Sequence, residues 1–240
     1  MRFFTTHRTC GRAPGVYERR SFLTMSITIL IILITAFISW RAFSDPQLRA
    51  QLMFLPTAVK ERGEYYRFIT HGFVHGDFNH LLFNMWALYI FGDAAEAIFS
   101  RFLFGATYGK LAYLLFYLVA IVASSYPDYL RHRDNRGYAS LGASGGVAAL
   151  LWPFVLFDPW NWFIFPPLPA ILLAVGYIFY SSYKDRVGGD NIGHNAHLWG
   201  AIFGLVVYVS LITFQNVPPD EVGLLERFIV LLGEPRGPSF

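Results

Sequence analysis

Four polar side chains, carried by three apolar stretches, are of the types that acyl transfer requires. Ser144 lies in a Gly-Ala-Ser-Gly sequence before one apolar stretch, and His197 stands at the start of another. His80 and Asn84 lie four residues apart at the start of a third, which places both on one face of a helix. A histidine can take the proton of a serine hydroxyl that attacks a carbonyl carbon. Two donors aimed at one point can hold the resulting oxyanion, so these residues together have the groups that acyl transfer needs.

Each of these residues also has a purely structural interpretation. A serine among small residues more often serves close packing of membrane helices, and a lone intramembrane asparagine can join helices by a hydrogen bond. His194 and His197, three residues apart, could cap a helix end or bind a metal. The histidines at 71, 75, 80, 194 and 197 could in principle supply zinc ligands, but the chain has no His-Glu-x-x-His helix of a metalloprotease. We therefore expect no metal and no cofactor.

The composition is that of a membrane protein. Of the 240 residues, 55% are hydrophobic and only 15% are charged, and the mean hydropathy is +0.41. Cys10 is the only cysteine, which excludes an intrachain disulfide and a cysteine-based zinc site. The formal net charge of +3 comes from basic residues between apolar runs. Such residues flank membrane spans, so we expect a lipid bilayer as partner and no nucleic acid.

The apolar runs predict an all-α membrane protein. A helix needs about 20 apolar residues to cross the hydrocarbon layer, and several uncharged runs of this chain come near that length. The six transmembrane helices that we predict are Phe22–Phe43, Phe78–Phe99, Leu111–Ser125, Gly137–Phe157, Leu168–Tyr183 and Ile192–Phe214.

The segments outside these spans divide the chain further. Residues 1–20 form an Arg-rich N-terminal tail, which could be a targeting presequence or a cytoplasmic extension. Residues 21–214 form the membrane domain, whose first loop, 44–77, mixes charged and apolar residues and is expected to lie in the membrane interface. Residues 215–240 form a C-terminal tail. Its apolar run, Leu224–Leu232, is too short to span and predicts a short interfacial helix.

The order of the predicted helices brings the four polar residues to one depth. Helices two, four and six start on the same face of the membrane, because an even number of crossings separates them. His80, Asn84, Ser144 and His197 each lie within about two helical turns of those starts. Polar groups at such a depth are costly unless they face the bundle interior or a wet cavity, so they are functional-site candidates.

Glycines favour close approach of the fourth and sixth helices. Gly200 and Gly204 form a Gly-x-x-x-Gly face after His197, and Gly142 and Gly145 flank Ser144. Close packing of these two helices would bring Ser144 to His197.

The chain resembles the rhomboid intramembrane serine proteases. The resemblance covers about residues 25–214. It rests on Tyr66-Arg67, His75-x-x-x-x-His80-x-x-x-Asn84, Gly92, Glu96, Gly142-Ala143-Ser144-Gly145 and Ala196-His197-x-x-Gly200-x-x-x-Gly204.

The resemblance implies a six-helix rhomboid-like bundle with an interfacial first loop and a serine endopeptidase activity. It assigns Ser144 as nucleophile and His197 as base. His80 and Asn84, with the Ser144 backbone N–H, would hold the oxyanion. The implied substrates are transmembrane segments of other proteins, and the six-helix form implies a bacterial inner membrane.

Two residues depart from the family's pattern. Tyr66 stands where many relatives have Trp. Ala148 stands where some relatives have a tyrosine that stacks on the catalytic histidine, so another group must orient the ring of His197 here. The nearest acids, Asp185 and Asp190, are expected in a loop and are poor candidates for that task. We therefore expect a dyad without a third carboxylate.

Two alternatives belong to other functional classes. A non-catalytic rhomboid-like protein would bind transmembrane segments, but would be expected to lack the serine or the histidine. A small transporter would also place polar residues at depth, but no second half of this chain repeats the first in an obvious way.

Overall fold

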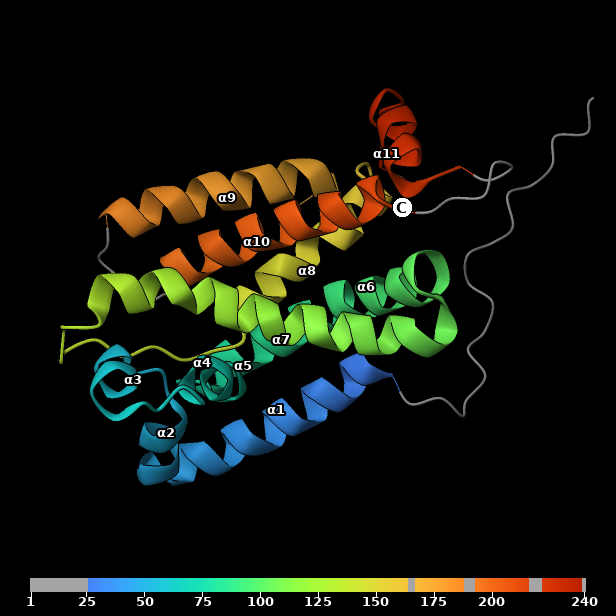
Figure 1. The fold of residues 1–240 in the computed structure, drawn as a ribbon. Coiled ribbons are helices and arrows are strands. Elements are labelled where there is room, and N and C mark those ends of the chain that lie inside the picture. Colours follow the sequence, from blue (N-terminus) through green and yellow to red (C-terminus); the bar gives the residue numbers. More distant parts are fainter. Residues whose placement is uncertain (1–25, 164–166, 188–192, 216–221, 239–240) are drawn as a thin grey trace, which may run out of the picture.

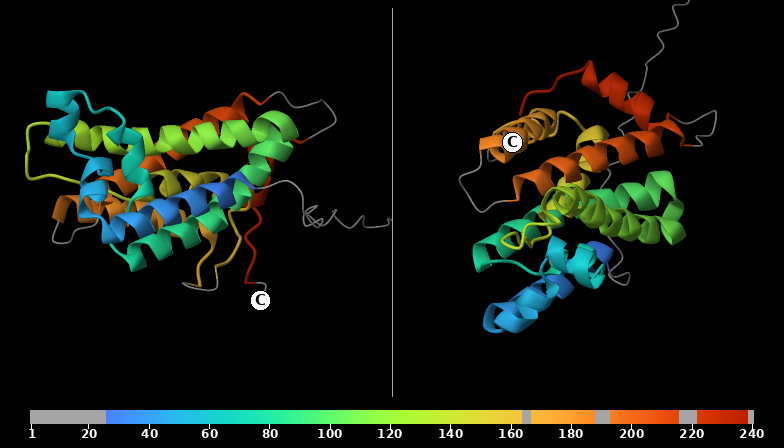
Figure 2. Two further views of the ribbon diagram at one scale, coloured as in Figure 1. Left: turned by 90° about the horizontal axis from the view of Figure 1, so that it is seen from below. Right: turned by 60° about the vertical axis from the view of Figure 1, so that its left-hand side comes forward.

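The computed structural model describes residues 26–163, 167–187, 193–215 and 222–238. These residues form a bundle of helices (Figure 1) in which the only β pairing is two isolated bridges. The all-α class is confirmed. Figures 1 and 2 show α1 (Ile27–Ser44) and α9 (Ala170–Val187) on opposite sides of the bundle. The predicted N-terminal tail, 1–20, lies outside the described residues.

Four described helices are long and apolar enough to cross a membrane. They are α1, a continuous helix over Phe78–Leu103, α7 (Gly105–His132) and α10 (His194–Thr213). The helix over Phe78–Leu103 combines α5 (Phe78–Ala87), η2 (Leu88–Gly92), α6 (Asp93–Ile98) and η3 (Phe99–Leu103), of which η2 and η3 are π-helical turns. Helix α9 corresponds to the predicted fifth span, but its last turns are polar.

The predicted fourth span, Gly137–Phe157, is wrong at its N-terminal end. Helix α8 begins at Ser144 and ends at Phe157. The preceding segment cannot be helical because Gly142 has φ of +121°. Its backbone hydrogen bonds go to the first loop instead: Ser140 pairs with Phe54 in both directions (2.8 and 3.0 Å), and the Gly142 N–H donates to the His71 carbonyl (2.9 Å).

The short helix α8 forms the centre of the bundle. Its 14 residues span only about 21 Å at ~1.5 Å per residue, less than the ~30 Å hydrocarbon core. It can be short because 11 of those residues are buried by protein, chiefly by α7 and α10 and also by η2 and α9. The first residue of α8, Ser144, can therefore lie below the membrane surface.

A buried carboxylate joins α6 to the start of α1. Glu96 is 5% exposed and accepts hydrogen bonds from the Ser26 hydroxyl (2.6 Å) and from the backbone N–H groups of Ile27 (3.0 Å) and Thr28 (2.9 Å). The first N–H groups of a helix lack partners in their own helix, and the positive end of its dipole favours an anion. Glu96 thus fixes α1 against the helix that carries His80 and Asn84.

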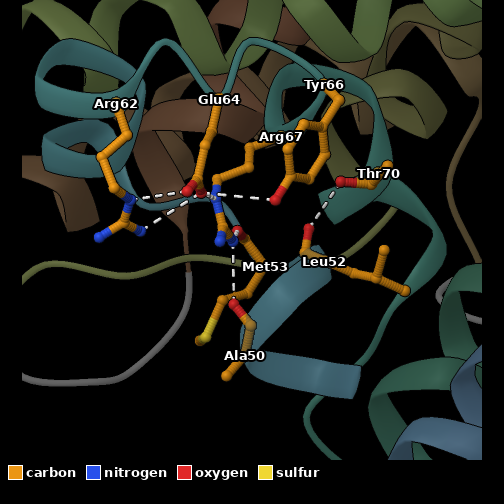
Figure 3. A network of polar contacts seen from close by, with 8 residues as sticks. All are labelled: Ala50, Leu52, Met53, Arg62, Glu64, Tyr66, Arg67 and Thr70. Atoms are coloured by element: carbon orange, nitrogen blue, oxygen red, sulfur yellow. Dashed lines mark hydrogen bonds and ion pairs between the residues drawn. The ribbon is translucent and has the colours of Figure 1, made fainter. Parts of the chain in front are cut away.

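The first loop folds into four short helices around a buried arginine (Figure 3). They are α2 (Pro46–Leu52), α3 (Pro56–Arg62), α4 (Arg67–Thr70) and η1 (His71–Phe73). The Arg67 guanidinium donates to the carbonyls of Ala50 (2.9 Å) and Met53 (2.7 Å) and pairs with Glu64 (2.5 Å). Arg67 therefore ties α2 to α4 and gives the loop a defined shape.

The C-terminal helix lies at the opposite end of the bundle from this loop (Figure 1). It is α11, and its bounds, Leu224–Leu232, are those of the predicted short helix. The Trp160 indole donates to the Leu231 carbonyl (2.8 Å), and Arg236 pairs with Asp158 (2.7 Å). The tail is thereby attached to the segment after α8, away from Ser144.

Candidate active site

A cavity of about 250 Å³ lies between α5, α8, α9 and α10. Ser144, His197 and Asn84 all line it, although they come from three helices that are far apart in the sequence. The rest of its lining is mainly apolar: Phe83, Ala87, Phe91, Val147, Ala148, Leu151, Leu173 and Tyr177. His80 is not among the lining residues. The cavity thus gathers three of the four predicted polar side chains beside apolar surface.

The backbones of α8 and α10 are in direct contact at this level. A Cβ atom added at Gly200 would lie 2.1 Å from the Gly145 carbonyl oxygen, and one added at Gly204 would lie 2.4 Å from that of Ala149. The Trp152 indole also donates to the Ala201 carbonyl (2.6 Å). Ser144 adjoins Gly145, and His197 lies one turn before Gly200. The contact therefore holds the two residues at the same height.

Gly142 has a different place from the one expected. It lies in the segment before α8 and does not pack against α10. A Cβ there would lie 2.8 Å from Cε1 of His80, so the glycine makes room for that ring. His80 itself lies in the first turn of α5, whose N-cap, Asp77, accepts a hydrogen bond from the His80 N–H (2.9 Å).

His75 connects the segment before Ser144 to α1. Its Nε2 accepts a hydrogen bond from the Ala143 N–H (3.3 Å), so the ring proton lies on Nδ1, which faces Ser39 Oγ (2.9 Å). Ser39 in turn donates to the Phe73 carbonyl (3.0 Å). Burial lowers the pKa of His75 to about 3, which keeps the ring neutral, as the accepting Nε2 requires. Sequence reasoning gave His75 no such part.

The Asn84 amide has a local partner. Its Nδ2 donates to the His80 carbonyl one turn earlier (2.9 Å), and the side chain is 8% exposed. An amide nitrogen carries two protons, so a second donor is left for a group in the cavity.

Comparison with known proteins identifies the family of this chain. A family model described as the Rhomboid domain matches residues 62–214. The chain belongs to the rhomboid family. It is 30% identical over 187 residues to the rhomboid protease GlpG of Haemophilus influenzae, covering 77% of this chain and 88% of that protein. It is 28% identical to the mitochondrial RHOMBOID-like protein 12 of Arabidopsis thaliana and 28% identical to Rhomboid-related protein 1 of Caenorhabditis elegans. The coverage is 73% and 72% of this chain but only 54% and 47% of those relatives.

Membership has two general consequences. This rhomboid is an integral membrane protein, since it combines the family's domain with helices apolar enough to cross a bilayer. The family supports intramembrane proteolysis as the general class of activity. The chain spans about half the length of the plant and worm relatives.

The rhomboid domain contains a buried acid that sequence reasoning missed. Asp128 of α7 is 2% exposed and accepts a hydrogen bond from Asn195 (2.5 Å), two residues before His197. It is the only acid or base among residues 111–130, and this isolation is the signal that could have revealed it. Asp128 thus holds the first turn of α10.

The two acids considered from sequence are not at the site. Asp185 lies in the last turns of α9, not in a loop as expected, and pairs with Arg131 (3.0 Å). Asp190 lies outside the described residues. Across the described ranges, no three His, Cys, Asp or Glu side chains are grouped as metal ligands would be.

Proposed function

We propose that this rhomboid is a serine endopeptidase that cleaves transmembrane segments with Ser144 as nucleophile and His197 as general base. The observation that carries the proposal is that Ser144, His197 and Asn84, from three separate helices, line one cavity. Helix packing alone would not require a hydroxyl, an imidazole and an amide to meet there. No carboxylate is assigned as a third catalytic residue beside Ser144 and His197.

The chemistry follows from the groups present. His197 accepts the Ser144 Oγ proton as Oγ attacks the scissile carbonyl carbon. The C–N bond then breaks and His197 returns the proton to the leaving amine. Water, activated by the same imidazole, hydrolyses the acyl-enzyme and regenerates Ser144. The overall reaction consumes one water and releases a carboxylate and an amine.

Three donors are proposed for the oxyanion: the Ser144 N–H, the Asn84 amide and the His80 ring. The Ser144 N–H belongs to the first turn of α8 and has no acceptor in its own helix. Asn84 lines the cavity, whereas His80 lies behind Gly142 and would act from the edge of the site. Loss of one such donor typically lowers kcat about 100- to 1000-fold, and we expect the larger loss for Asn84.

The apolar lining and the depth of Ser144 favour a transmembrane segment as substrate. Cleavage requires an unwound backbone, whose peptide groups lipid cannot satisfy but a polar cavity can. We place the protein in a bacterial inner membrane, through six spans. Relatives named as mitochondrial and chloroplastic proteins make an organelle membrane the competing location.

The test is cleavage of a transmembrane reporter by purified protein in proteoliposomes. Ser144→Ala and His197→Ala should each abolish cleavage. Ser210→Ala should retain it, because Ser210 of α10 is exposed and donates a hydrogen bond to the Val206 carbonyl of its own helix. Labelling by a fluorophosphonate should require both Ser144 and His197. Undiminished turnover in either alanine variant would refute the proposed Ser144–His197 dyad. Reporter binding with neither cleavage nor labelling by wild type would identify a non-catalytic rhomboid-like protein.

A further inference from the structure

The ring of His197 is supported from α9. The Tyr177 ring lies against it with centroids 5.8 Å apart and planes inclined by 24°, a stacked arrangement. Tyr177 and His197 both line the cavity. Ala148 of α8 lines it too, but a methyl group offers no ring face. The aromatic support therefore comes from a helix that the sequence pattern did not indicate.

The stack belongs to a larger arrangement of four rings. On α10, His194 meets His197 edge to face (5.8 Å, 79°). On α9, Tyr180 meets His194 edge to face (5.6 Å, 80°). Tyr177 and Tyr180 are three residues apart, as are His194 and His197, so each pair occupies one face of its helix. The two pairs form a ladder of rings along the α9–α10 interface.

We infer that Tyr177 is a positioning residue for the general base, an inference that rests on the proposed function of His197. The torsion that turns an imidazole about its Cβ–Cγ bond has a broad energy profile, so an unsupported ring samples many angles. A flat ring stacked on one face restricts that torsion, while the edge of His194 limits movement from another side. The ring of His197 is thereby held in one orientation in the cavity that Ser144 also lines. Tyr177 acts through His197 and need not contact the substrate's reacting atoms.

The decisive comparison is between Tyr177→Leu and Tyr177→Phe in the proteoliposome assay. Phe keeps the ring face, so kcat should stay within about twofold of wild type. Leu fills similar space without a flat face, so kcat should fall about 10- to 100-fold with KM nearly unchanged, the pattern for a lost transition-state interaction. The matched control is Phe179→Leu, since Phe179 lies on the same helix and is 72% exposed. Its kcat should be that of wild type.

A second measurement keeps the inference testable if Tyr177→Leu does not fold. In wild-type protein labelled at histidine, the His197 ring protons should show an upfield ring-current shift, assigned by comparison with His197→Gln. Tyr177→Phe should preserve that shift. Absence of the shift in wild type, or equal kcat for the folded Leu and Phe variants, would overturn the positioning role.

Failure of this inference can be distinguished from failure of the proposed function. If Ser144→Ala is inactive while Tyr177→Leu turns over normally, only the role of Tyr177 is lost. If Ser144→Ala remains active, the dyad itself is wrong, and the effect of Tyr177 on kcat would need another explanation.

Discussion

Helix α10 meets its neighbours α8 and α9 in two different ways. Against α8, backbone touches backbone at Gly200 and Gly204. Against α9, side-chain rings meet, Tyr177 with His197 and Tyr180 with His194, and α9 fully buries only Ala170, Ala174 and Ser181. Its outer face is open, with Phe179 72% and Tyr183 62% exposed. The first interface fixes where the backbones of Ser144 and His197 lie, and the second supplies the group that orients a ring.

The difference follows from the forces available in lipid. Between membrane helices the hydrophobic effect gives no net drive, so stability comes from close packing and hydrogen bonds. The interface at Gly200 and Gly204 supplies both, through close backbone contact and through the hydrogen bond from Trp152 to the Ala201 carbonyl. The α9 side offers fewer backbone contacts, and we expect its substitutions to change activity more than folding.

The largest effect is expected from Gly200→Leu. Its Cβ would lie 2.1 Å from the Gly145 carbonyl oxygen, a clash with backbone that no rotamer change can relieve. Overpacking typically costs about 1–3 kcal/mol, more where the backbone must move. We expect loss of a monodisperse folded protein in detergent and of all cleavage, measured by size-exclusion chromatography and the reporter assay. A folded, active variant would show that the two helices need not touch.

Asp128→Ala should have the next largest effect, because it releases the first turn of α10. Removing one partner of a buried hydrogen bond costs about 1–3 kcal/mol. Thermal unfolding in detergent should occur at lower temperature, and kcat should fall as His197 loses its fixed backbone. Asp128→Asn is the control, since a carboxamide oxygen can still accept from Asn195. Equal stability of the Ala and Asn variants would contradict this role.

Acidification should loosen the segment before Ser144. Burial lowers the pKa of His75 to about 3 and that of His71 to about 4, whereas both titrate near 6.5 when unfolded. Below pH 6.5 the unfolded chain binds more protons, so stability decreases as pH falls from 6.5 toward these folded-state values. Unfolding at pH 7.5, 5.5 and 4.5 should show this loss.

The His75→Gln variant isolates the contribution of His75 to the pH dependence of stability. Gln cannot titrate, so the pH dependence above 4.5 should be reduced. The carboxylate Glu64 does not interfere in this window. Its ion pairs with Arg62 and Arg67 lower its pKa to about 2, and its contribution to stability is lost only below about pH 4.3. If the stability of His75→Gln fell with pH as steeply as that of wild type, His75 would be excluded as a source of the pH dependence.

The smallest effect is expected from Gly176→Ala on α9. A Cβ at Gly176 would meet nothing within 4 Å, in contrast to Gly200. Alanine is the better helix former by up to about 1 kcal/mol, so thermal stability should be unchanged or slightly higher and cleavage retained. Loss of folding in this variant would show that α9 is packed at Gly176 as tightly as α10 is packed at Gly200.

Much of the site could be predicted from sequence because it depends on order and spacing along one chain. Charge-free runs indicated where helices form, and the parity of the helices placed Asn84, Ser144 and His197 at one depth. The cavity brings these three together. The spacing of Gly200 and Gly204 indicated a closely packed face, which the structure places against α8. Four described helices meet the criteria for spanning, so the count of six spans stays a prediction.

The tertiary structure decided the features that depend on contacts between segments far apart in sequence. Helix α8 starts at Ser144 because Gly142 is left-handed and because Phe54 and His71 take the preceding backbone hydrogen bonds. Asp128 reaches α10, and Tyr177 reaches His197, across helix interfaces. Periodicity within a run specifies which face of a helix a residue occupies, but not which neighbouring helix that face meets. Sequence alone therefore identified Ser144 and His197 as candidates for nucleophile and base, whereas only the packing of α9 on α10 showed which ring lies against His197.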